Sequence, residues 1–167
     1  MPVNRRADQA TSDAMPGGQL RTMAGAATGS KMMTVGDLTL QPGVDTVYHI
    51  HPNTEESIFV VEGEVEMRLD GHKFRAKAGD CMVARRGLGH GIANAGGGVA
   101  RFVVMYPSAS PEREITEEPE WKSGAPDQGV FFRDRVESFE FTPGVSRYDM
   151  VGDFLGSESS YFSELTL

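Results

Sequence analysis

The sequence of 167 residues is poor in the features that mark several common classes of protein. It has a single cysteine, Cys81, which excludes an intrachain disulfide and fits a reducing, cytoplasmic compartment. It has no apolar run of membrane-spanning length, and its first residues lack the apolar core of a signal peptide. Positive charge is scarce, because 16 Lys and Arg stand against 24 Asp and Glu, a net charge of −8. We therefore expect neither a membrane nor a nucleic acid as a partner.

Helical periodicity is also missing, whereas turn-forming residues are abundant, with 20 glycines and 9 prolines. The clearest turn is Asp70-Gly71, a two-residue hairpin loop in which both positions need a positive φ. Counting outward from it brings apolar side chains together on one face and opposite charges together on the other. The predicted pairs are Val65 with Ala76, Met67 with Phe74, Glu64 with Lys77, Glu66 with Arg75 and, as the one unfavourable pair, Arg68 with Lys73. An all-β fold is predicted.

Three of the four histidines stand in a pattern typical of metal ligands. His49 and His51 alternate on a predicted strand over residues 45–51, so their imidazoles face the same side. Glu56 opens the next predicted strand, and His90 comes from a separate segment. Three imidazoles and one carboxylate form a ligand set for one divalent transition metal, namely Mn, Fe, Ni, Co or Zn.

Glu55 is the rival carboxylate, and on a strand it would point to the face opposite Glu56. We favour Glu56, because apolar residues share its face. The apolar wall predicted beside the metal consists of Val47, Ile58 and Val60. The fourth histidine, His72, lies beside the hairpin turn and is expected to be solvated.

At these residues the chain resembles the cupin family, of the cupin_2 type. The residues that carry the first cupin motif are Gly43, His49, His51, Glu56 and Gly63. Those that carry the second are Gly79, Arg85 where proline is usual, Gly87, His90 and Asn94. The resemblance covers about residues 32–107. It implies a jelly-roll β-barrel with extra N- and C-terminal segments and with one metal bound inside at His49, His51, Glu56 and His90.

The resemblance also implies an activity. Cupins with this ligand set include dioxygenases, decarboxylases and isomerases that act on small oxygen-rich metabolites; a non-catalytic module that binds or senses a small ligand is the alternative. The expected ligand has one chelating end and a less polar body, which ranks α-keto, enediol or phenolic compounds above oxalate. The sequence identifies no catalytic acid or base. The residues that could reach the pocket, each expected at the surface or rim, are Glu55, Arg68, Arg101 and Tyr106.

The predicted organisation has four parts. They are a flexible N-terminal arm (1–15), the cupin barrel (16–107), an acidic proline-rich linker (108–127) and a C-terminal segment (128–167). The last segment repeats the region before the metal motif: residues 16–40 and 143–167 share nine identities in twenty-five positions at a constant offset of 127. This suggests the start of a second cupin unit, truncated or swapped, as in a bicupin. We therefore expect a homodimer with exchanged or augmenting terminal strands.

Overall fold

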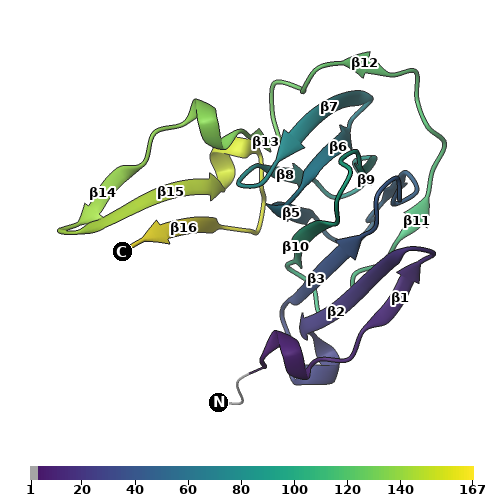
Figure 1. Cartoon of the computed structure of the whole chain (residues 1–167), viewed down its shortest axis with the longest axis horizontal. Helices are drawn as coiled ribbons and strands as arrows, with labels where there is room; N and C mark the ends of the chain where they lie inside the picture. Colours follow the sequence, from purple (N-terminus) through teal and green to yellow (C-terminus); the bar gives the residue numbers. More distant parts are fainter. Residues whose placement is uncertain (1–3) are drawn as a thin grey trace.

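The computed structural model describes residues 4–167, and its regular secondary structure is mainly short strands, which form three sheets in this part of the chain (Figure 1). The seven-stranded sheet has the order β1 (Ser12–Met15), β2 (Gly18–Ala24), β3 (Thr34–Leu40), β10 (Ala100–Tyr106), β5 (Glu56–Glu62), β8 (Cys81–Ala84) and β13 (Val130–Phe131). The six-stranded sheet has the order β11 (Glu114–Ile115), β4 (His49–Ile50), β9 (His90–Asn94), β6 (Glu64–Leu69), β7 (His72–Lys77) and β12 (Lys122–Ser123). The third sheet contains β14 (Phe139–Thr142), β15 (Val145–Val151) and β16 (Phe162–Thr166).

The two larger sheets pack face to face as a jelly-roll β-barrel, which confirms the predicted all-β class. Their inward side chains alternate along each strand with outward ones, as the two-residue period of a strand requires. The main core draws on both sheets: Leu38, Leu40, Ile58, Val60, Phe102 and Val104 come from one, and Val65, Met67, Leu69, Phe74, Ala76 and Ile92 from the other. Burial of this apolar surface is the main force that holds the sheets together.

The hairpin of β6 and β7 has the register that the sequence predicts. Val65 faces Ala76 and Met67 faces Phe74 on the buried side. At the turn, Asp70 and Gly71 have φ values of 49° and 77°, in the left-handed region that this loop requires.

The predicted strand over residues 45–51 is shorter in the structure. Only His49–Ile50 form β4, and Asp45 makes an isolated bridge to Ala93. Between them the Thr46 hydroxyl accepts a hydrogen bond from the Ile92 N–H at 2.9 Å, so a side chain takes the place of a regular ladder contact. Strict alternation therefore does not extend back from His49 along this segment.

The segments outside the barrel motif also contact the barrel. Of the arm over residues 1–15, residues 1–3 lie outside the described part, and the rest contains η1 (Arg6–Asp8) and β1. The segment 108–127 follows the barrel surface, because β11 pairs with β4 and β12 pairs with β7. Within residues 4–167, no helix is long and apolar enough to cross a membrane.

The third sheet has the same backbone plan as the N-terminal strands. At an offset of 127, the β14–β15 and β15–β16 pairs have the registers of β1–β2 and β2–β3, with the bulges at corresponding places. The single-turn helices η2 (Ala26–Thr28) and η4 (Asp153–Leu155) follow β2 and β15, and Gly29 and Gly156 end them with φ values of 87° and 84°. We call residues 6–40 the N-terminal unit and residues 133–167 the C-terminal unit. The N-terminal unit continues into the barrel sheet through β3, whereas the sheet of the C-terminal unit extends to one side of the barrel (Figure 1).

Candidate metal centre

The four predicted ligand side chains meet inside the barrel. His49 stands on β4, and His51 follows it after one residue. Glu56 is the first residue of β5, and His90 is the first residue of β9, where it faces His49 in register. All four residues are buried, with His90 fully inaccessible.

The carboxylate of Glu56 is the centre of this cluster. Its Oε2 lies 2.7 Å from the Nε2 of His90, 3.1 Å from that of His51 and 3.9 Å from that of His49. One ligand atom from each of the four residues lies within 4.8 Å of the others. A metal about 2.0–2.2 Å from each ligand atom separates the ligand atoms by about 3–4.4 Å, so the cluster has the size of a first coordination shell.

Each imidazole is oriented by the main chain. The Nδ1 of His49 donates to the carbonyl of Val47 and that of His90 to the carbonyl of Leu88, both at 2.8 Å. The Nδ1 of His51 donates to the carbonyl of Glu112. With Nδ1 as the donor, the neutral form of each ring presents the lone pair of Nε2, the atom that converges on Glu56, whereas a protonated ring also donates to Glu56 from Nε2.

The electrostatics of the cluster favour a bound cation. Burial by itself would raise the pKa of Glu56, but hydrogen bonds from His51 and His90 hold it well below its usual range. Burial, and then the charge of His90, lower the pKa of His49 to about 3, so this imidazole is neutral near pH 7. For His51, the contact with Glu56 outweighs burial and raises the pKa. Neutral imidazole and ionised carboxylate are the forms that bind a metal, and the donor set fits a divalent transition ion.

Tyr106 completes the surroundings of Glu56. Its hydroxyl donates to the second carboxylate oxygen, Oε1, at 2.7 Å, so all of this carboxylate is engaged. Burial and the neighbouring Glu56 raise the pKa of the Tyr106 phenol well above its usual range, and the charge of Arg113 opposes this only in part. Tyr106 therefore remains a hydrogen-bond donor at neutral pH, inside the site rather than at its rim.

A cavity of about 100 Å³ adjoins the cluster. It is lined by His49, Glu56 and His90, by Tyr106, Thr46 and Arg113, and by a largely apolar wall of Ala14, Met15, Leu20, Leu38, Ile58, Ile92 and Val104. Of the predicted wall, Ile58 is present, but Val60 is buried in the core away from the cavity and Val47 is 56% exposed. Val47 faces outward because the strand that was expected to carry it is irregular before His49.

Two segments outside the sequence motifs line the cavity. The N-terminal strands supply part of its apolar wall, and Arg113, which follows the barrel, supplies a charged group. The sequence motifs gave no signal for either, because both reach the cavity only through long-range packing. The residues of β1 and β2 that line it are Ala14, Met15 and Leu20.

The other candidates named from the sequence serve elsewhere. Arg101 binds the buried Asp37, with Nη2 to Oδ2 at 2.6 Å. Arg68 is buried and pairs with Asp45 and Glu118, not with the cavity. His72 is partly exposed, and its Nδ1 bonds the carbonyl of Gly124 at 3.1 Å. The lining of the metal cavity includes none of Arg68, His72 and Arg101.

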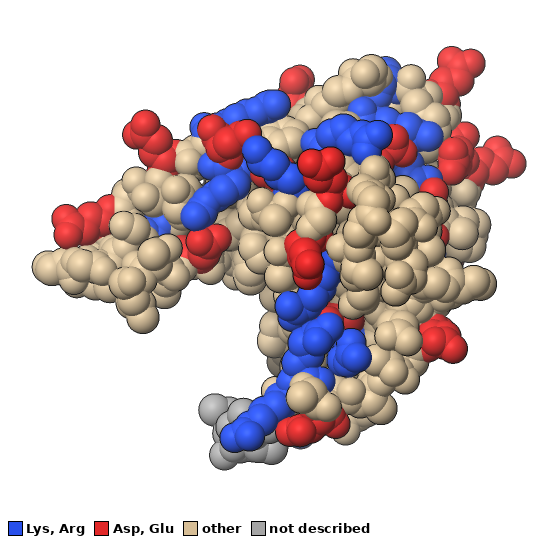
Figure 2. Space-filling view, in the orientation of Figure 1, with Lys and Arg blue, Asp and Glu red and all other residues tan. Residues whose placement is uncertain are grey.

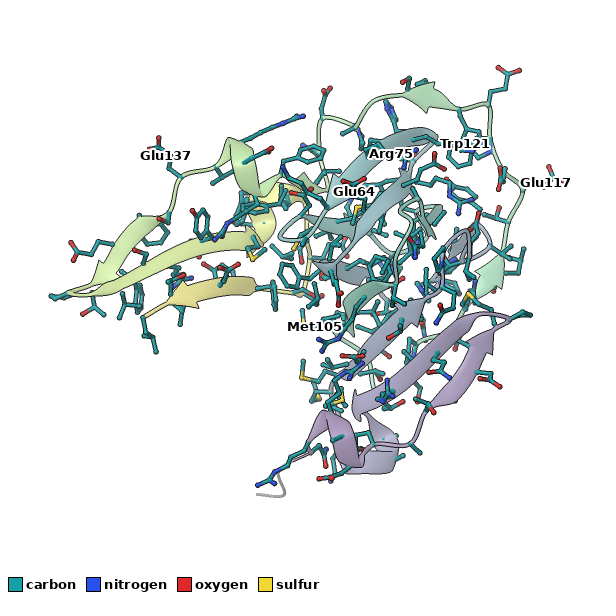
Figure 3. The ribbon with its side chains drawn as sticks, in the orientation of Figure 1. Glu64, Arg75, Met105, Glu117, Trp121 and Glu137 are labelled. Atoms are coloured by element: carbon teal, nitrogen blue, oxygen red, sulfur yellow. The ribbon has the colours of Figure 1, made fainter. Side chains whose placement is uncertain are left out.

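A larger, open groove of about 1000 Å³ lies outside the barrel beside β7. Arg75 and Trp121 stand there (Figure 3), and the Lys73 ammonium lies 4.4 Å from the centroid of the Trp121 ring. Lys and Arg side chains gather over this region and along the described N-terminal unit, with Asp and Glu between them (Figure 2). Two of the three converging imidazoles, those of His49 and His90, line the smaller cavity, so the candidate site is placed there.

Comparisons with known proteins agree with this fold. Residues 36–106 match the cupin domain family. The polyketide synthase protein CurC of Streptomyces cyaneus is 32% identical over 100 residues, which cover 59% of this chain and 65% of CurC. The tetracenomycin polyketide synthase protein TcmJ of Streptomyces glaucescens is 27% identical over 100 residues, which cover 59% of this chain and 67% of TcmJ. The matched region thus spans about two thirds of the length of these relatives.

Among solved structures, the polyketide cyclase RemF of Streptomyces resistomycificus has the same fold, with a TM-score of 0.61 at 22% identity. The match covers 72% of this chain and 90% of RemF. With the barrel, both sequence motifs and the converging ligand set in place, the class is a cupin with a possible metal site. The family match is to the cupin domain over residues 36–106, and the barrel has the fold of a cupin.

Proposed function

We propose that this protein is a metal-dependent enzyme that acts on a small oxygen-rich metabolite. The observation that carries the proposal is the buried set of three Nε2 atoms around the Glu56 carboxylate, open on one side to a cavity. His49, His51, Glu56 and His90 would hold one divalent transition metal. Such an ion supplies Lewis-acid or redox chemistry to a ligand oxygen.

The cavity indicates the class of substrate. Its volume of about 100 Å³ is that of about three water molecules, so it accepts the reacting end of a molecule and not a large body. The apolar wall suits a hydrocarbon or aromatic portion, whereas Arg113 suits a negative charge. We infer a carbonyl compound that can become an enolate or phenolate. The relatives described as polyketide synthase proteins support this class.

Within this proposal, Tyr106 holds a proton at its hydroxyl and orients Glu56 through Oε1. The backbone carbonyls at Val47, Leu88 and Glu112 fix the three imidazoles, and the apolar wall excludes water from the reacting end. We propose that the reaction is that of a dioxygenase, a decarboxylase or an isomerase.

The proposal is tested by a thermal-shift screen of the metal-loaded protein against small acids, enediols, phenols, β-diketones and sugars, followed by a search for turnover of each hit. Stabilisation by enediols, phenols or diketones that disappears in His51→Ala is expected, because that variant lacks one ligand. A hit that persists in His51→Ala contradicts binding through the metal. The small cavity favours, as the alternative, a non-catalytic ligand-binding module, and metal-dependent hits that are never converted would support it.

Arg113 offers a prediction about selectivity. Arg113→Gln is expected to weaken binding of an anionic hit by about tenfold, because a hydrogen bond to a charged partner contributes roughly 1.5–3 kcal/mol. Isothermal titration of the metal-loaded variant measures this change. Lys31→Gln removes an exposed positive charge outside the cavity lining and should leave the affinity unchanged. An equal loss in both variants would assign the effect to overall charge.

We also propose a cytoplasmic location, supported by the single buried thiol of Cys81, and a homodimer. The outer edge of β3 pairs with β10, but among the described residues β16 borders only β15. Leu165 and Leu167 are 54% and 97% exposed, whereas their counterparts in the N-terminal unit, Leu38 and Leu40, are buried. An apolar strand edge of this kind favours pairing with a second copy.

Light scattering after size-exclusion chromatography is expected to give a dimer for the full chain. Leu165→Lys should shift it to a monomer, because a lysine on the strand edge opposes pairing. Val99→Lys places the same charge on an exposed loop position outside this edge and should leave the dimer intact. A wild-type monomer at micromolar concentration would refute the pairing.

A further inference from the structure

Glu55, directly before the proposed ligand Glu56, is held by the C-terminal unit. The Oγ of Ser157 donates to Oε1 at 2.7 Å, the N–H of Ser159 to Oε1 at 3.1 Å, and the N–H of Glu158 to Oε2 at 2.8 Å. Burial by itself would raise the pKa of Glu55, but these bonds hold it below its ordinary value. The carboxylate is ionised, buried and fully engaged by residues more than a hundred positions away.

The two adjacent carboxylates are thus fixed on opposite faces of one backbone segment. Glu56 points into the barrel and accepts bonds from His51, His90 and Tyr106. Glu55 points to the C-terminal unit and accepts bonds from Ser157, Glu158 and Ser159. Because the two residues share a peptide unit, displacement of one moves the other.

The turn that binds Glu55 belongs to the second copy of the internal repeat, and the first copy contains a matching turn. In residues 157–160 the Oγ of Ser157 accepts from the N–H of Ser160 and lies near the Ser160 carbonyl, both at 2.9 Å, so its one proton is shared between that carbonyl and Glu55. In residues 30–33 the Oγ of Ser30 makes the same two bonds to Met33, at 2.7 and 3.3 Å. Within residues 4–167 no carboxylate forms a hydrogen bond with the Ser30 hydroxyl. The turn therefore forms without one, and the contact with Glu55 belongs to the second copy alone.

The contact is accompanied by apolar packing nearby. Met150 and Val151 of the C-terminal unit form a buried cluster with Cys81 and Val83 of β8. Phe162 packs on Phe59 of β5 with ring centroids 5.6 Å apart. The C-terminal unit therefore rests on the outer face of the same strand whose first residue, Glu56, reaches the metal cavity.

We propose that the C-terminal unit and the metal centre are energetically coupled through Glu55, which acts with Ser157 as a pair of positioning residues for Glu56. This inference rests on the proposed metal site. Docking of the Ser157 turn fixes Glu55 and so favours the position of Glu56 that binds the metal. By thermodynamic reciprocity, a bound metal strengthens docking of the C-terminal unit by the same factor.

The test uses the full chain with Co²⁺ as the probe, whose visible spectrum reports its coordination. Glu55→Gln keeps the size of the side chain but turns an amide N–H₂ toward main-chain donors, and Ser157→Ala removes one donor. Ser30→Ala is the matched control, because it removes the same bonds within the turn and touches no carboxylate. We expect the Co²⁺ affinity to fall about tenfold in Glu55→Gln, less in Ser157→Ala, and not at all in Ser30→Ala.

Amide hydrogen exchange provides the second readout. In the wild type, Co²⁺ is expected to slow exchange in residues 145–162, and in Glu55→Gln this slowing is lost together with a change in the Co²⁺ spectrum. Unchanged affinity and slowing in Glu55→Gln would overturn the coupling, and so would an equal loss in Ser30→Ala and Ser157→Ala. If the wild type binds no Co²⁺, the proposed metal function itself is refuted. If the wild type binds Co²⁺ but the variants behave as just described, only the coupling is refuted.

Discussion

Replacement of His90 by alanine is expected to remove tight binding of a divalent transition metal, lowering the affinity by at least about a hundredfold. His90 is fully buried, and its Nε2 lies 2.7 Å from the Glu56 carboxylate, so no other described side chain is placed to replace it. Loss of a partner that only orients a ligand costs roughly 10–100-fold, and loss of a ligand costs more. Competition titration against a chelator measures the affinity.

The control is His72→Ala, because His72 is the histidine outside the cluster and bonds only the Gly124 carbonyl. Its metal content should equal that of the wild type. Elemental analysis of wild-type protein purified without a chelator or a metal-affinity tag provides the absolute test. Less than about a tenth of an equivalent of metal would mean that the cluster does not bind metal in the protein as isolated.

The double variant Asp45→Asn, Glu118→Gln is expected to lower the free energy of unfolding by about 3–5 kcal/mol, the cost of leaving a buried charge without its partner. The Arg68 side chain is 2% exposed, while its partners Asp45 and Glu118 are 46% and 51% exposed. The arginine therefore bears the desolvation cost, and the carboxylates offset it. Urea-induced unfolding measures the change.

Adding Arg68→Met to this double variant should recover most of the loss, because a buried ionic group replaced by an apolar one of similar volume is often neutral or stabilising. The difference in stability between the double and the triple variant distinguishes an electrostatic role of Arg68 from a packing role. If the triple variant is less stable than the double variant, Arg68 contributes mainly through its packing, and the electrostatic explanation is wrong.

The β6–β7 hairpin shows how far local sequence determined the fold. Its turn, its apolar pairs and its charge pairs all specify one register, and the structure has that register from Glu64–Lys77 to Arg68–Lys73. The four proposed ligands were predictable for a similar reason. Their spacing is short within each motif, and a jelly-roll brings the two motifs together.

The remainder of the site depended on contacts that no local pattern encodes. Strand alternation predicted that Glu55 faces away from Glu56, but its partner, the Ser157 turn, is about a hundred residues away. Val47 was misplaced because alternation was extended over residues 45–51, whereas only His49–Ile50 form a regular strand. Arg113 belongs to a segment that by composition resembles a linker, and only pairing of β11 with β4 brings this segment to the cavity.

The origin of the cavity wall has a consequence for how such a protein diversifies. The four proposed ligands come from the two motifs of the barrel, whereas Ala14, Met15 and Leu20 on the N-terminal hairpin and Arg113 in the later segment touch whatever lies beside the metal. The stretches of sequence that supply the proposed ligands therefore do not supply the whole cavity wall, part of which varies independently of them. Exchange of residues 12–24 between related barrels is expected to reshape one side of the cavity while leaving the four proposed ligands in place.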